Sequence, residues 1–213
     1  MLDVHPPHEP VHGLRDFMLH LLTITIGLLI ALGLEGLVEW RHHQNLRHEA
    51  ATNIRKEMAV NRKELTELLA AIPGEQSSLT GMLANLQDRQ AGRPMQGERR
   101  RLNMKIAGLQ DASWQTANAT GALAYMEFDE VQQYAAAYQL QKQLDGLQNS
   151  AVDNVVGLQA LLATADPEKM NTADAASAVN IDRSLMAHIE TLRELAVSLN
   201  QTYSTTLDAK GND

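Results

Sequence analysis

The sequence predicts an all-α protein with a single N-terminal transmembrane helix followed by an antiparallel helical bundle or coiled-coil-like domain. Residues 17–38 form an apolar run that only His20, Thr23, Thr25 and Glu35 interrupt. About twenty such residues cross a hydrocarbon core of ~30 Å. After residue 40, strong helix formers predominate, whereas aromatic residues make up only 4% of the chain. We therefore expect a Pro/His-rich tail at 1–13, a transmembrane helix at 14–40, a helical bundle at 41–207 and a frayed tail at 208–213.

A cleaved signal peptide is the main alternative to a membrane anchor. It requires a basic start, an apolar run of about 7–15 residues and small residues at a cleavage site. The chain instead begins Met1-Leu2-Asp3, and its longer apolar run leads into Glu39-Trp40-Arg41. These features favour the anchor.

The first helix is predicted to begin near Leu14, because the prolines at 6, 7 and 10 prevent a helix in the tail. Apolar side chains recur every three or four residues between positions 44 and 72, which predicts that the anchor continues into an amphipathic helix. Pro73 and Gly74 are expected to end it, with a second helix at 76–90. Residues 95–110 are predicted to be an extended or irregular connector.

Later helices are predicted from capping residues and apolar stripes. Asp111 or Ser113 is expected to cap a helix that ends at residue 126, and Asp129 to cap a long one that ends before 166–167. The last helix is expected at about 172–207. Substitutions at Leu144, Leu158 or Leu192 are expected to be costly, and substitutions at Gln141 or Gln148 to be tolerated.

Composition argues against several function classes. The chain has no cysteine, which removes disulfides and thiol catalysis from consideration, and its net charge of −8 argues against nucleic-acid binding. The basic run at 99–101 is interpreted as a solvated loop. Two histidine groups are not expected to bind a metal. The prolines of the tail leave His5, His8 and His12 without a rigid frame, and His42, His43 and His48 lack the spacing of a site on one helix face. We expect no catalytic residue, cofactor or metal.

Two stretches carry a resemblance. Residues 5–9, 15–17 and 23–35 together resemble the start of a group of uncharacterised bacterial inner-membrane proteins that have one N-terminal anchor and a helical domain. A looser similarity to the helical domains of such proteins covers residues 113–117 and 120–123 with Tyr134 and Tyr138. The resemblance implies a bacterial origin and a helical body, and it brings no reaction.

One face of the apolar helix is small and polar. His20, Thr23, Gly27, Ala31 and Glu35 fall within about one third of its circumference at 100° per residue. Gly27 and Ala31 allow close approach of a second helix, and Thr23 and His20 can form hydrogen bonds across such a contact. We predict that this face is a transmembrane interface, either with another copy of the chain or with another membrane protein. For Glu35, the alternative is that its carboxylate extends to the lipid headgroups.

Two function classes follow from these features. The first is a membrane-anchored, non-enzymatic structural or accessory subunit, and the alternative is a helical sensor that binds a ligand between its helices. Basic residues follow the apolar run at positions 41, 47, 55 and 56, whereas Arg15 alone precedes it. The positive-inside rule therefore predicts a body that faces the cytoplasm, with a periplasmic body as the alternative.

Overall fold

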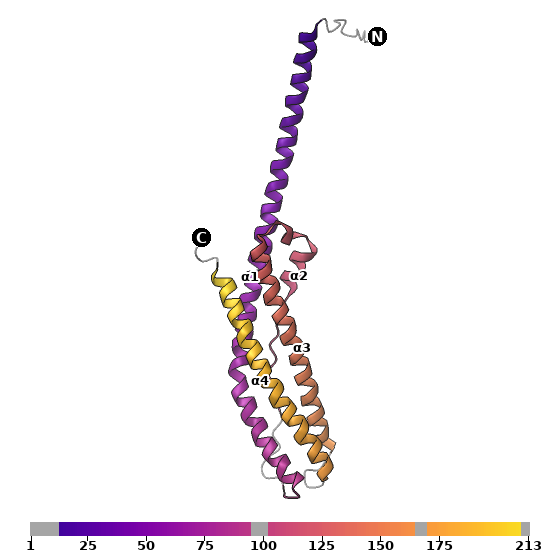
Figure 1. Cartoon of the computed structure of the whole chain (residues 1–213), viewed down its shortest axis with the longest axis vertical. Coiled ribbons are helices and arrows are strands. Elements are labelled where there is room, and N and C mark those ends of the chain that lie inside the picture. The colour runs from indigo at the N-terminus through magenta and orange to yellow at the C-terminus, as the bar shows by residue number, and fades with distance from the viewer. Residues whose placement is uncertain (1–12, 95–101, 165–169, 210–213) are drawn as a thin grey trace, which may run out of the picture. The chain divides into compact units, whose positions relative to one another are not determined.

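The computed structural model describes residues 13–94, 102–164 and 170–209, and within these ranges the chain is helical and has no strand (Figure 1). The elements are α1 (Leu14–Gln90), α2 (Ala112–Ala119), the 3-10 helix η1 (Ala122–Tyr125), α3 (Phe128–Thr164) and α4 (Thr172–Asp208). The all-α prediction is therefore confirmed. The chain divides into two compact units, residues 1–48 and 49–213, and the boundary falls within α1.

The predicted break at Pro73 and Gly74 is wrong, because α1 continues through both residues to Gln90. A proline inside a helix removes one backbone hydrogen bond, but Pro73 lies on the exposed side, where water can hydrate the freed carbonyl. Ile72 and Leu79 are both 1% exposed. Tertiary packing on either side of Pro73 therefore outweighs its local helix-breaking preference.

Contacts between α1 and α4 occur in opposite order along the two helices. Three hydrogen bonds mark this order: Arg55 Nη1 to the Thr206 carbonyl (3.0 Å), Gln76 Nε2 to Glu190 Oε2 (3.1 Å) and Arg89 Nε to the carbonyl of Met170, which lies just before α4 (2.7 Å). Arg55 also donates to the carbonyl of Leu207. Its guanidinium thus binds free carbonyls at the C-terminus of α4, where a positive charge is favourable.

Contacts between α1 and α3 occur in the same order along both helices. Tyr138 donates its hydroxyl proton to Glu57 Oε1 (2.6 Å), and Asn61 Nδ2 donates to Gln141 Oε1 (3.2 Å). Residues 102–111, here called the strap, lie between these two helices and have no regular secondary structure (Figure 1). The predicted extended connector is thereby confirmed for its described part, and residues 95–101 lie outside the described ranges.

The strap must be extended for geometric reasons. Glu75 binds the backbone of Lys105, and Glu57 binds the backbone of Ser113. The roughly eight residues from Lys105 to Ser113 therefore run alongside the roughly eighteen helical residues between Glu75 and Glu57 of α1. Eighteen helical residues rise about 27 Å. Eight residues reach about 26–29 Å only when the backbone is fully extended.

The apolar core follows the predicted stripes. Leu144 and Leu158 are fully buried and Leu192 is 2% exposed, as their spacing indicated. Two predicted boundaries need correction: the helix that begins after Asp111 ends at Ala119 rather than at residue 126, and α3 begins at Phe128 rather than at Glu130. Gly121 has a φ of +74°, which provides the turn between α2 and η1.

Candidate functional site

The predicted transmembrane face is exposed along its whole length. His20, Thr23, Gly27, Ala31 and Glu35 are all exposed, and a methyl group placed on Gly27 would meet no atom of the described chain within 4 Å. Thr23 Oγ1 donates its proton to the carbonyl of Leu19 at 2.9 Å within the same helix. Because its proton is already used within the helix, this hydroxyl can accept a hydrogen bond from a second helix.

The remainder of this segment is exposed too. Every large apolar side chain from Leu14 to Trp40 is at least 47% exposed. Among the described helices, α1 alone is long and apolar enough to cross a membrane, and none of its apolar stretch is buried within the structure. A core helix of a soluble domain would meet the same criteria of length and composition, but its apolar side chains would be covered.

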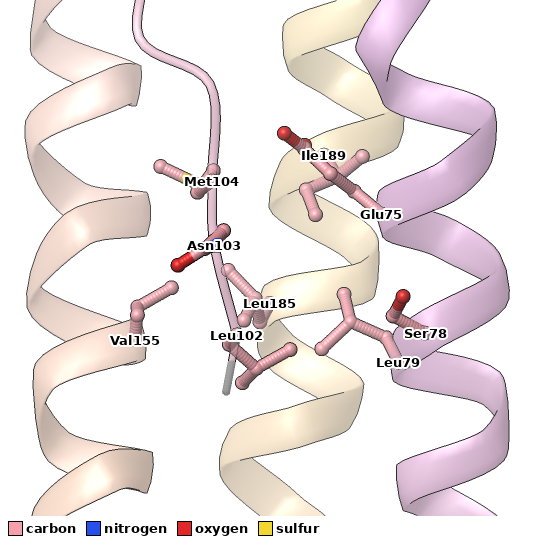
Figure 2. Close-up of a pocket in the computed structure, with 9 residues that line it drawn as sticks. All are labelled: Glu75, Ser78, Leu79, Leu102, Asn103, Met104, Val155, Leu185 and Ile189. Carbon is pink, nitrogen blue, oxygen red and sulfur yellow. The ribbon is translucent and has the colours of Figure 1, made fainter. Parts of the chain in front are cut away.

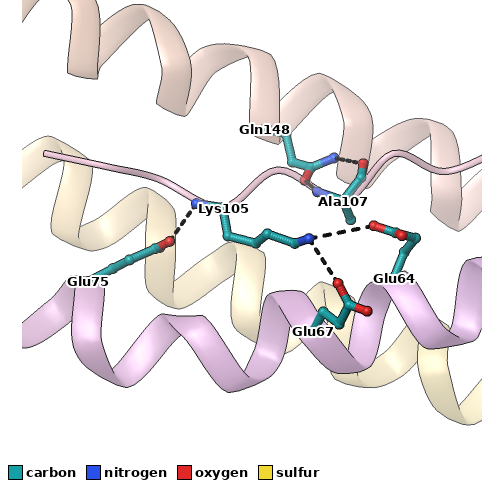
Figure 3. A network of polar contacts seen from close by, with 6 residues as sticks. All are labelled: Glu64, Glu67, Glu75, Lys105, Ala107 and Gln148. Atoms are coloured by element: carbon teal, nitrogen blue, oxygen red, sulfur yellow. Dashed lines mark hydrogen bonds and ion pairs between the residues drawn. The ribbon is translucent and has the colours of Figure 1, made fainter.

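In the body, side chains from α1 and α3 hold the backbone of the strap. Gln148 Oε1 accepts a hydrogen bond from the Ala107 N–H at 2.8 Å, and Gln148 Nε2 donates to the Ala107 carbonyl at 3.3 Å (Figure 3). Asn61 binds the backbone of Gln110 in the same way. Its Oδ1 accepts a hydrogen bond from the Gln110 N–H at 2.8 Å, and its Nδ2 donates to the Gln110 carbonyl at 2.6 Å. Each side-chain amide thus replaces both partners that a neighbouring β-strand would supply.

Further contacts complete the attachment of the strap. Gln141 Nε2 donates to the Gln110 carbonyl at 3.1 Å, Gln159 Nε2 donates to the Leu102 carbonyl at 3.1 Å, and Glu75 Oε1 accepts from the Lys105 N–H at 2.6 Å. Because an unpaired backbone group is costly to bury, these side chains explain how an extended segment can lie between helices.

The expectation that Gln141 and Gln148 tolerate substitution conflicts with their environment. Both residues are 3% exposed, and both form hydrogen bonds with the strap. Asn61, which is fully buried, was not singled out from the sequence at all. Replacing any of these amides with an apolar side chain would leave buried polar groups without partners.

Glu57 joins α1, α2 and α3 at one point. Its Oε2 accepts from the Ser113 N–H at 2.7 Å at the start of α2, and its Oε1 accepts from the Tyr138 hydroxyl. Asp111 occupies the predicted N-cap position, but its side chain forms no capping hydrogen bond. Trp114 stacks on Tyr138 with ring centroids 5.3 Å apart. Burial, followed by the bond to Glu57, raises the pKa of Tyr138 well above its usual value.

The Lys105 side chain is partly exposed and lies beside α1. Its Nζ is 3.0 Å from Glu67 Oε2 and 3.8 Å from Glu64 Oε2 (Figure 3). The hydrogen bond from Lys105 lowers the pKa of Glu67. Glu75 behaves in the opposite way, because burial raises its pKa more than the bond from the Lys105 backbone lowers it.

A small pocket lies where the strap meets α1, α3 and α4. Figure 2 shows its lining, in which Leu79 and Leu185 face Leu102 of the strap. Its volume is about 20 Å³, which is room for about one water molecule. In this conformation the pocket is too small for an organic ligand.

The structure describes one of the two histidine groups, the one that follows the apolar run. His43 Nε2 lies 4.0 Å from Glu39 Oε1, and the rings of His42 and His43 are 6.0 Å apart. No cluster of three metal-capable side chains occurs in residues 13–94, 102–164 and 170–209. His5, His8, His12 and the basic run at 99–101 lie outside the described residues.

Comparisons of the chain with protein-family models, with curated proteins and with solved structures found no match. The exposed apolar helix, its small polar face and the amide-held strap therefore carry the functional inference.

Proposed function

We propose that this protein is a membrane-anchored, non-enzymatic structural or accessory subunit of a bacterial inner membrane, with residues 14–40 of α1 as its single transmembrane segment. The observation that carries the proposal is the exposure of every large apolar side chain from Leu14 to Trp40. Burying one such side chain fully is worth about 1.5–3 kcal/mol, so covering the whole segment is worth on the order of tens of kcal/mol. A lipid bilayer covers all sides of such a helix at once.

Assembly is proposed to use the face that contains His20, Thr23, Gly27, Ala31 and Glu35. Lipid tails are as apolar as leucine, so helix association in a bilayer depends on close packing and hydrogen bonds. The open space around Gly27 supports this proposal, because a partner helix can reach the backbone there. The partner is either a second copy of the chain or another membrane protein.

In-membrane crosslinking of the full-length protein tests this assembly. Gly27→Ile should abolish the crosslinked species, because the new side chain blocks close approach, whereas Leu28→Ile on another face is the matched control and should change nothing. Glu35→Gln should weaken crosslinking less than Glu35→Leu if a partner binds the side chain. Unchanged crosslinking in Gly27→Ile would contradict the proposed interface.

The body is proposed to be an antiparallel bundle in which the strap takes the position of a helix. The opposite order of the α1–α4 contacts and the return of the strap past α1 support this interpretation. A spacer or platform role is favoured over catalysis because the buried polar side chains beside the strap are engaged with the chain itself. Glu57, Asn61 and Gln148 each bind backbone groups of the strap or of the residues that follow it.

We propose a cytoplasmic body on the basis of the basic residues that follow the apolar run. Gly74 is exposed and offers a test site. A cysteine introduced by Gly74→Cys should resist a membrane-impermeant maleimide in intact spheroplasts and react after permeabilisation. Reaction in intact spheroplasts would place the body in the periplasm.

A further inference from the structure

Asp182 is a buried acid without a polar partner. Asp182 is 0% exposed, and neither of its carboxylate oxygens has a hydrogen-bond partner within the described part of the chain. Ionised carboxylates are rarely left in this state, because the loss of hydration is uncompensated. The side chain therefore requires a physical explanation beyond packing.

Its surroundings are apolar. Asp182 lies one turn after Ala178 and Val179 on the buried face of α4, and these two residues belong to an apolar cluster with Leu86 of α1 and Leu158 of α3. On the other side, one turn later, Leu185 lines the small pocket together with Leu79. Along the body, Asp182 therefore lies between the Gln76–Glu190 hydrogen bond and the Arg89–Met170 hydrogen bond.

The charged groups of the neighbouring elements have other partners or lie at the surface. Arg183 on α4 and Asp153 on α3 are exposed. The others have the following partners: Asp88 pairs with Arg93, Arg89 donates to Met170, Glu75 accepts from the Lys105 backbone, Glu190 pairs with Arg193, and the His188 ring lies 2.9 Å from Asn154 Nδ2 of α3. Burial alone raises the pKa of Asp182, to about 6, and none of these charges contributes.

We propose that Asp182 is a proton-operated latch: its protonated side chain is compatible with close packing of the N-terminal part of α4 against α1 and α3, whereas its ionised side chain favours opening of this end of the body. In the open state water hydrates the carboxylate, so its pKa returns to the ordinary value of 3.8. The closed state binds the proton more tightly, and the closed state is therefore progressively destabilised as pH rises from about 4 to about 6.

The size of the effect follows from the two pKa values. A difference of about two pKa units changes the opening equilibrium by about a hundredfold over the whole titration, of which about tenfold falls between pH 5 and pH 7.5. The remainder of α4, where Tyr203 and Arg55 make their contacts, should respond less to pH.

Hydrogen–deuterium exchange of the full-length protein in nanodiscs tests the latch. After correction for intrinsic exchange rates, protection of residues 172–190 should fall about tenfold from pH 5 to pH 7.5, relative to residues 192–206 in the same sample. Asp182→Asn should remove this pH dependence, and the exposed control Asp153→Asn should retain it. Asp182→Leu suits the apolar surroundings and should be protected equally at both pH values, which keeps the test usable if the asparagine variant folds poorly.

Two results would overturn the proposal. One is equal protection of residues 172–190 at both pH values in the unmodified protein. The other is a tenfold pH dependence that persists in Asp182→Leu or Asp182→Asn, since it would then arise from another group.

Discussion

Replacing Gln148 with leucine tests whether side-chain amides hold the strap. The substitution keeps a side chain of similar size in a site that is 3% exposed, but it removes both hydrogen bonds to Ala107, itself 3% exposed. Each buried backbone group left unpaired costs about 1–3 kcal/mol. Burial of the leucine offsets part of this cost. The free energy of unfolding should therefore fall by about 1–4 kcal/mol.

The assay is guanidinium unfolding of the full-length protein in mild detergent, followed by far-UV circular dichroism. Gln143→Leu is the matched control, because Gln143 lies on the same helix with its side chain exposed. It should stay within about 0.5 kcal/mol of the unmodified protein. The amide of Ala107 should also exchange faster in Gln148→Leu, because its acceptor is gone. Equal stability of the two variants would refute the role assigned to Gln148.

Three further substitutions test the fold. Leu158→Ala should cost about 2–5 kcal/mol, because it removes a fully buried side chain from the core; a loss below about 1 kcal/mol would contradict the core assignment. Pro73→Ala should raise the free energy of unfolding by up to about 3 kcal/mol, because α1 is continuous there, and no gain would indicate a broken helix. Lys105→Met should reduce the free energy of unfolding less than Gln148→Leu does, because its ion pairs are exposed while its backbone stays bound to Glu75; an equal or larger loss would mean that the ion pairs hold the strap.

The helices could largely be predicted from the sequence. Leu14 as the start of α1 and the range 172–207 for α4 followed from prolines and apolar spacing, and the structure agrees closely. The predicted helix end at Pro73 was wrong because the local preference of proline contains no information about tertiary packing, which maintains the helix on both sides of this residue. Asn171, which accepts a hydrogen bond from the Asp174 N–H, was a recognisable N-cap that the prediction did not use.

The strap contacts could be predicted only in part. Gln141 and Gln148 are separated by seven residues and continue the buried stripe of Tyr134, Leu144 and Ala151, so their burial could have been inferred from periodicity. Their hydrogen-bond partners in the strap could not be inferred in this way. A side-chain amide that binds backbone is specified by the path of residues 102–111, and that path depends on the three-dimensional arrangement of α1 and α3.

Alkaline extraction of membranes from cells that express the protein tests the membrane anchor most directly. The protein should remain in the washed membrane pellet, and mass spectrometry of this pellet should detect peptides from residues 14–40. A protein that is released by the wash, or one that has lost residues 14–40 by cleavage, would contradict the anchor and with it the proposed assembly through Gly27.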